Sequence, residues 1–192
     1  MNGNGRTIHR LHTPISDEAV AALRAGDSVQ LSGRIYTARD AAHKRIVEAM
    51  ERGEEPPFAF AGTAVYYAGP TPPRPGAVIG SIGPTTSGRM DAYAPALIRR
   101  GLKVMIGKGL RDAEVRRAIA ECGGLYLAAI GGAAALISRS VVRAETVAYD
   151  DLGTEAVRLL EVHDFPAVVA IDAQGNDIYA LRKQAAEETG GS

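Results

Sequence analysis

Cysteine, net charge and long apolar runs are all scarce in this sequence, and each scarcity excludes a class of protein. Cys122 is the only cysteine, so the chain has no internal disulfide and cannot build a zinc or iron–sulfur site from its own thiolates. We expect Cys122, near the end of a helix, to be buried or half-buried and inert. Lysine plus arginine equals aspartate plus glutamate, at 22 each. That balance argues against nonspecific binding to nucleic acid or to an anionic membrane, which needs a positive excess.

No segment has the apolar length that is needed to cross a bilayer. Residues 1–6 have no apolar core, so we expect no signal peptide and a cytoplasmic protein without a membrane partner. A length of 192 residues suits one domain. We expect a flexible N-terminus over residues 1–10, the domain over 11–182 and a flexible C-terminus over 183–192.

Strand patterns and helix patterns alternate along the chain, which predicts an α/β layered domain. The expected strands are 28–36, with Gly33 as a bulge, and 77–82, 102–106, 125–130, 141–149 and 165–171. The expected helices begin at the caps Ser16, Thr37 and Asp112, and a further amphipathic helix is expected over 154–162.

The segment 83–91 is the one around which we expect the site to form. Gly83 and Pro84 break the preceding apolar run, and Thr85 is then the expected N-cap residue of the helix that follows. Arg89 follows four residues later, on the same helix face. A hydroxyl, a guanidinium and free backbone amides suit a carboxylate or a phosphate. The alternative is an ordinary capped helix with a solvated arginine.

Two more cations occupy similar positions. Arg39 falls in the first turn of the helix that Thr37 is expected to cap, and Lys108 lies between two glycines at the end of a strand. Each of the three cations, taken alone, could be a solvated surface charge. Together they match an anion with more than one negative group. Cations around Thr85 would favour its alkoxide, and so its use as a base.

Six blocks of the sequence resemble the C-terminal (β) half of class I fumarases and L-tartrate dehydratases. They occur in family order, cover about residues 12–182, and are residues 33–45, 66–70, 83–91, 106–109, 131–136 and 164–177. The segment 83–91, the lysine loop and the Arg39 block are specific as a set, whereas no single glycine pair would be.

This resemblance implies a swivelling β/β/α domain and an iron–sulfur hydro-lyase that adds water to a dicarboxylate, or removes it, as in the hydration of fumarate to (S)-malate. In that family the α part holds a 4Fe-4S cluster on three cysteines, and the β part supplies cations and a threonine proposed as the general base. Carried over by motif, Arg39, Arg89 and Lys108 bind the carboxylates and Thr85 is the base. No metal ligand is expected in this chain.

The sequence departs from the family pattern because the α part is absent. We therefore expect a separate β subunit that is inactive until an alpha subunit carrying the cluster docks, in an α2β2 assembly. Residues 66–76, which are rich in proline, are either part of that interface or a surface loop. The same cations would serve an L-tartrate dehydratase or a mesaconate hydratase. The alternative of another class is a non-catalytic anion-binding or regulatory domain.

Overall fold

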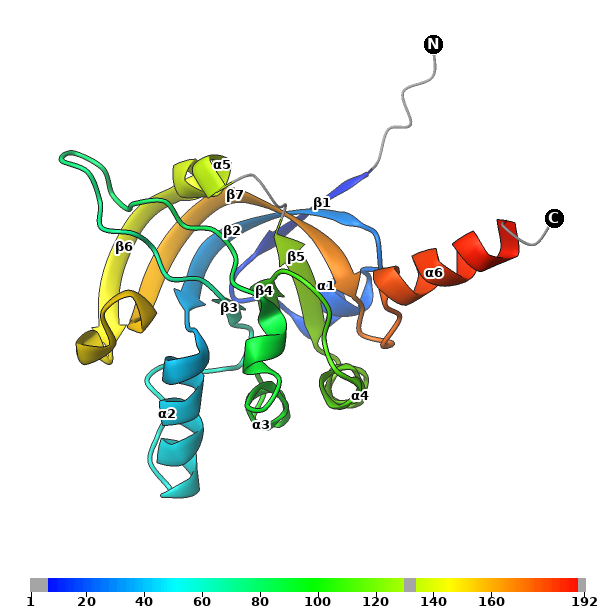
Figure 1. Ribbon diagram of the computed structural model, residues 1–192, viewed down its shortest axis with the longest axis horizontal. Coiled ribbons are helices and arrows are strands. Elements are labelled where there is room, and N and C mark those ends of the chain that lie inside the picture. The colour runs from blue at the N-terminus through cyan, green and yellow to red at the C-terminus, as the bar shows by residue number, and fades with distance from the viewer. Residues whose placement is uncertain (1–6, 130–133, 190–192) are drawn as a thin grey trace, which may run out of the picture.

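Within residues 7–129 and 134–189, which the computed structural model describes, seven strands form one sheet and helices cover its outer side (Figure 1). The strands are β1 (Ile8–His12), β2 (Ser28–Thr37), β3 (Ala64–Tyr66), β4 (Val104–Gly107), β5 (Leu125–Ala129), β6 (Val141–Ala148) and β7 (Val157–Ile171). The helices are α1 (Asp17–Ala21), α2 (Asp40–Glu51), α3 (Ala94–Arg99), α4 (Ala113–Cys122), α5 (Ala134–Ser140) and α6 (Ile178–Thr189), with two 3-10 helices, η1 (Ser87–Met90) and η2 (Asp150–Glu155).

The long strands β2 and β7 close the sheet into a ring. Strands β2, β3, β4 and β5 follow one another in parallel, β5 pairs antiparallel with β7, and β7 pairs antiparallel with β2. Strand β1 pairs in parallel with the first half of β2, and β6 pairs antiparallel with the first half of β7. The expectation of an α/β layered domain is confirmed, with a closed ring of strands as its centre.

Side chains alternate between two hydrophobic cores, as the pleat of a strand requires. On β4, Val104 and Ile106 point into the ring, whereas Met105 belongs to the outer core. The outer core is closed by α2, α3 and α4, which lie together on one side of the sheet (Figure 1). On α2, Ala42 and Ile46 are fully buried, one turn apart. This outer core lies directly behind the candidate site.

Local signals in the sequence were mostly reliable. The side chains of Ser16 and Asp112 cap α1 and α4 by accepting hydrogen bonds from backbone N–H groups, as expected. Gly33 has a φ of +103° and sits at a register shift between β2 and β7, which confirms the bulge. A Cβ at Gly33 would lie 2.4 Å from Thr13 Oγ1, so a side chain has no room there.

Four expectations outside the segment 83–91 were wrong. Residues 154–162 are not a helix: they include the end of η2 and the start of β7, where Leu160 and Val162 are buried on either side of exposed Glu161. This alternation of buried and exposed side chains is typical of a strand. A short window around the two adjacent leucines does not reveal it. Residues 77–82 form no strand. Thr37 does not cap α2, because it ends β2 and its Oγ1 accepts a hydrogen bond from Arg158 N. Cys122 is exposed.

Other expectations concern residues outside the described ranges. Residues 1–6, the glycine pair at 131–132 and residues 190–192 are among them, so the domain limits remain a prediction. Helix α6 continues to Thr189 and so includes most of residues 183–192, which were expected to form a flexible C-terminus.

Candidate functional site

Helix α2 places Arg39 at one side of the candidate site. Arg39 is the N-cap residue and has an extended backbone, but its side chain makes no capping hydrogen bond. The cap comes instead from Glu155, which lies 114 residues from Ala41 in the chain and accepts a 3.0 Å hydrogen bond from its N–H. The other carboxylate oxygen of Glu155 is 3.1 Å from Arg39 Nη2. Glu155 therefore caps the helix and orients the arginine, and no local sequence signal points to it.

Asp40 joins two of the three expected cations. Its Oδ2 is 2.7 Å from Arg89 Nη2, and its Oδ1 is 3.6 Å from Arg39 Nη2. The Arg39 side chain is 20% exposed and that of Arg89 is 51% exposed. Among the described residues, Arg39 Nε is buried and has no hydrogen-bond partner. This nitrogen is a donor whose hydrogen-bonding capacity is not used within the described residues.

The backbone brings Thr85 beside Lys108. Thr85 N donates a 2.7 Å hydrogen bond to Tyr67 O, and Tyr67 N donates a 2.8 Å bond to Ile106 O. One residue further along, Thr86 forms a parallel bridge with Lys108, and Ser87 N donates to Lys108 O at 2.8 Å. The segment 83–91 thus runs along the end of β4, and its threonines adjoin the lysine loop.

The N-cap expected at Thr85 was wrong. The helix that follows is η1, a 3-10 helix of four residues whose N-cap residue is Thr86, without a side-chain capping bond. Helix α3 starts only at Ala94. A helix this short has little dipole, so the site depends on side-chain cations rather than on a helix N-terminus.

Gly107 allows the close approach of these segments. A Cβ on Gly107 would lie 2.0 Å from Ser87 Oγ and 3.1 Å from Tyr67 Cδ2. Ser87 is fully buried and shares a 2.9 Å hydrogen bond with the hydroxyl of Tyr126, which is also 2.9 Å from its acceptor Gly109 O. Tyr126 therefore links the lysine loop, through Gly109, to the threonine segment, through Ser87.

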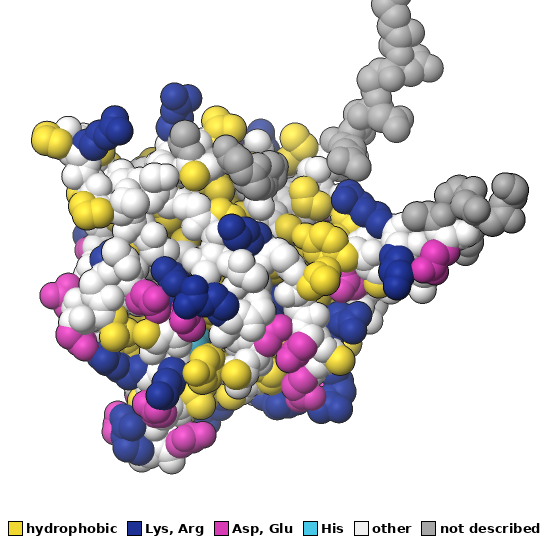
Figure 2. Space-filling model, in the orientation of Figure 1, with side chains coloured by type: hydrophobic (Ala, Val, Ile, Leu, Met, Phe, Trp, Pro, Cys, Tyr) yellow, Lys and Arg dark blue, Asp and Glu magenta, His cyan; other side chains and the backbone are white. Residues whose placement is uncertain are grey.

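Charge on this face is mixed rather than purely positive. Figure 2 shows basic side chains beside acidic ones just above α2. Arg39 and Arg89 both have acidic partners, whereas Lys108 is exposed and makes no ion pair with any residue in the described ranges. An incoming anion would therefore meet one free cation and two arginines that are already oriented.

A buried layer lies behind the site, and sequence reasoning did not find it. The Arg111 side chain is fully buried, and its Nε donates a 2.6 Å hydrogen bond to Asp91. Its guanidinium lies over the rings of Tyr67 and Tyr126, 5.3 and 5.0 Å from their centroids. Burial lowers the pKa of His43 to about 4, which keeps it neutral near pH 7, and burial raises the pKa of Tyr67. A buried ion pair of residues far apart in sequence leaves no local pattern.

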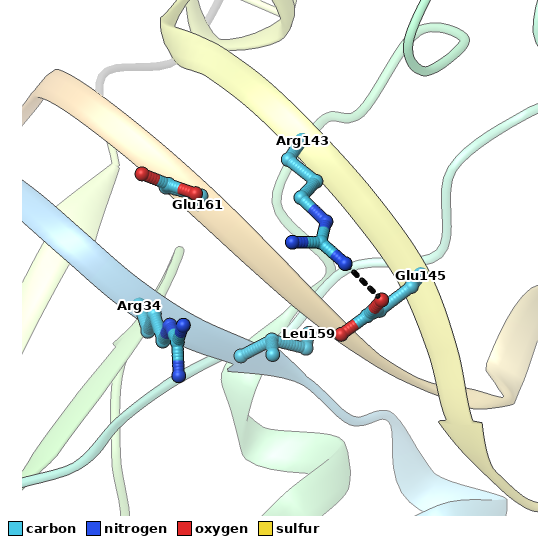
Figure 3. A pocket seen from close by; sticks show the side chains of 5 residues that line it. All are labelled: Arg34, Arg143, Glu145, Leu159 and Glu161. Carbon is cyan, nitrogen blue, oxygen red and sulfur yellow. Dashed lines mark hydrogen bonds and ion pairs between the residues drawn. The ribbon is translucent and has the colours of Figure 1, made fainter.

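The small hollow in Figure 3 is separate from this site. It has a volume of about 130 Å³ and lies across β2, β7 and β6. Arg34, Glu161 and Arg143 are neighbours across these strands, and Arg143 Nη2 donates a 2.8 Å hydrogen bond to Glu145. None of the four expected site residues lines it. The ion pair among its charges, Arg143 with Glu145, lies along β6 itself.

The described residues do not fit a metal or a cluster. They include no group of three or more histidine, cysteine, aspartate or glutamate side chains placed to hold a metal ion. Cys122, the only thiol in the chain, is exposed on the last turn of α4. No helix in the described ranges is both long and apolar enough to span a membrane.

The closed ring of strands carries the arginine, lysine and threonine side chains of the candidate site, and comparison with known proteins identifies the family of this domain. The family model "Fumarase C-terminus" matches residues 3–182, and the chain belongs to that family. It is 39% identical over 182 residues to fumarate hydratase class I, aerobic, of Salmonella typhimurium, which covers 92% of this chain and 31% of the relative. The family expected from the sequence is thereby confirmed.

Two further relatives differ in length. Fumarate hydratase 2 of Leishmania major is 41% identical over 157 residues, covering 81% of this chain and 28% of the relative. A protein of Methanocaldococcus jannaschii named "Putative L(+)-tartrate dehydratase subunit beta" is 42% identical over 171 residues, covering 86% of this chain and 88% of that protein. The chain thus spans about a third of the fumarate hydratases and most of the tartrate dehydratase subunit.

Proposed function

We propose that this chain is the β subunit of a hydro-lyase that hydrates fumarate to (S)-malate reversibly. The observation that carries the proposal is the convergence of three distant segments: Arg39 and Arg89 meet at Asp40, and the Thr85 segment is bridged to Lys108. Two arginines and a lysine complement the two carboxylates of a dicarboxylate.

In this proposal each residue has one task. Arg39 and Arg89 bind the carboxylates as planar forks, and Lys108 adds a point charge. Thr85 transfers the proton at the substrate carbon: its hydroxyl gives a proton to one carbon in hydration and takes it back in dehydration. The hydroxyl group of the product is added at the other carbon of the double bond.

The residues of this chain do not fit a 4Fe-4S cluster, so we assign the cluster to a separate alpha subunit. The relative named as a subunit beta, which is close to this chain in length, supports a two-subunit enzyme. An α2β2 assembly, with residues 66–76 at the interface, is part of the same proposal. L-tartrate is the alternative substrate, supported by the name of that relative, and mesaconate is a further alternative.

The test is anaerobic co-expression with the alpha subunit and an assay against fumarate, L-tartrate and mesaconate. Thr85→Ala is expected to lose turnover while substrate binding is largely kept, and Lys108→Ala and Arg89→Ala are expected to raise KM. Equal turnover for the Thr85 variant and the parent would remove Thr85 from the mechanism. Dicarboxylate binding by a complex that neither hydrates fumarate or mesaconate nor dehydrates L-tartrate would favour the non-catalytic anion-binding domain.

A further inference from the structure

Unpaired polar atoms gather behind the site. Seven buried side-chain atoms in residues 7–129 and 134–189 lack a hydrogen-bond partner, and five of them belong to residues 39, 40, 43, 67 and 111. Buried polar atoms without partners are rare, and each one needs an explanation. Two of the five belong to site residues Arg39 and Asp40. The other three are His43 Nε2, Tyr67 Oη and Arg111 Nη2.

These three atoms belong to side chains in mutual contact. The ring of Tyr67 meets the imidazole of His43 edge-on, with 5.1 Å between centroids, and the Arg111 guanidinium lies 5.3 Å from the centroid of the same tyrosine ring. Tyr67 and His43 are fully buried. Tyr67 is therefore the member that can connect the other two.

The donors and acceptors of the three atoms are complementary. His43 Nδ1 is 2.9 Å from Arg39 O, and since a carbonyl only accepts, Nδ1 carries the proton and Nε2 is an acceptor. Arg111 Nη2 can only donate. The hydroxyl of Tyr67 can accept from the arginine and donate to the histidine.

We propose that Tyr67 is a positioning residue whose hydroxyl accepts from Arg111 and donates to His43, directly or through one ordered water. This hydrogen-bond relay runs from Arg111 through Tyr67 and His43 and ends at the backbone carbonyl of Arg39. Through its own backbone carbonyl, Tyr67 also holds Thr85 N at 2.7 Å. One residue thereby fixes the carboxylate-binding arginine relative to the threonine. The catalytic meaning of the relay rests on the proposed function, whereas the relay itself does not.

The first test is ¹⁵N NMR of the histidine side chains in the 192-residue chain, the parent against Tyr67→Phe. The parent should show His43 with the proton on Nδ1, and the variant should move the Nε2 resonance toward that of a free acceptor. Tyr66→Phe is the matched control, because Tyr66 is equally buried but its hydroxyl donates to Ile82 O in the other core. A proton on Nε2 in the parent, or an identical His43 spectrum in the Tyr67 variant, overturns the relay.

The second test is kinetic and uses the complex with the alpha subunit. Tyr67→Phe should raise KM for fumarate about three- to tenfold and leave kcat within about twofold, because it loosens Arg39 without touching the reacting atoms. His43→Asn, whose amide N–H can still donate to Arg39 O but which places no acceptor at the position of Nε2, should behave alike. Unchanged KM in both variants overturns the positioning role. A parent complex without any turnover would count against the proposed function instead, and the NMR result would then decide the relay alone.

Discussion

Gly107→Ala is the substitution whose consequence the structure defines most sharply. The new methyl carbon would lie 2.0 Å from Ser87 Oγ and 3.3 Å from Ser87 Cβ, and Ser87 is completely buried. Overfilling a packed site costs about 1–3 kcal/mol. For a chain of this size, about 2 kcal/mol lowers Tm by about 4–8 °C. The strain falls on the contact between the lysine loop and the threonine segment, so dicarboxylate binding should weaken as well.

Urea and thermal unfolding of four variants would test this reasoning. Ser87→Ala removes the nearest atom but deprives the Tyr126 hydroxyl of one of its two hydrogen-bond partners, so it should cost about 1 kcal/mol. The double variant should be less destabilised than the sum of the two, because the hydroxyl that clashes is gone. Gly124→Ala is the control: its Cβ would meet Ile119 Cα at 3.6 Å, an ordinary contact. A Gly107→Ala protein as stable as the parent, or strict additivity in the double variant, would refute the close-approach argument.

Three further outcomes follow from the buried charges and from the cap. Asp91→Asn should cost about 3–5 kcal/mol in urea unfolding, because it leaves Arg111 buried without its charged partner; a loss under 1 kcal/mol would contradict this. The folded pKa of His43, about 4, is lower than its ordinary 6.5, so the unfolded chain binds more protons between these values. The contribution of His43 to the free energy of unfolding is complete above about pH 6.5 and falls by on the order of 3 kcal/mol toward pH 4. His43→Asn should therefore flatten that part of the stability–pH curve. An unchanged slope in the variant would disprove this role of His43. Glu155→Ala should cost about 1 kcal/mol by uncapping Ala41 N, and circular dichroism melts should show it; an unaltered melt would mean that water replaces the cap.

Sequence patterns predicted what depends on neighbours in the chain. The caps at Ser16 and Asp112 and the bulge at Gly33 each follow from a residue type at a local position, and all three are present. Their hydrogen bonds or backbone angles involve residues within a few positions, so a short window contains the whole cause.

Interactions between distant segments could not be predicted in this way. Thr37 looked like a cap because the window around it contains no better one, and the true cap, Glu155, arrives from η2. The ion pair of Asp91 with Arg111 spans twenty residues and has no periodicity. The three expected cations were selected from their positions at strand–helix junctions and again from the family resemblance, but the acidic partners of Arg39 and Arg89 became visible only in the fold.

The ring of strands has a consequence for the nascent chain. Strand β7 supplies a neighbour to β2, β5 and β6 at once, and it follows all three of them in the chain. Until Val157 and the residues after it emerge, β2 lacks its long antiparallel partner and the ring cannot close. Folding that must join segments more than a hundred residues apart is slow, and open strand edges invite wrong pairings while they wait. The residues of the candidate site precede β7 in the chain, but the ring that positions them is complete only when β7 has been added.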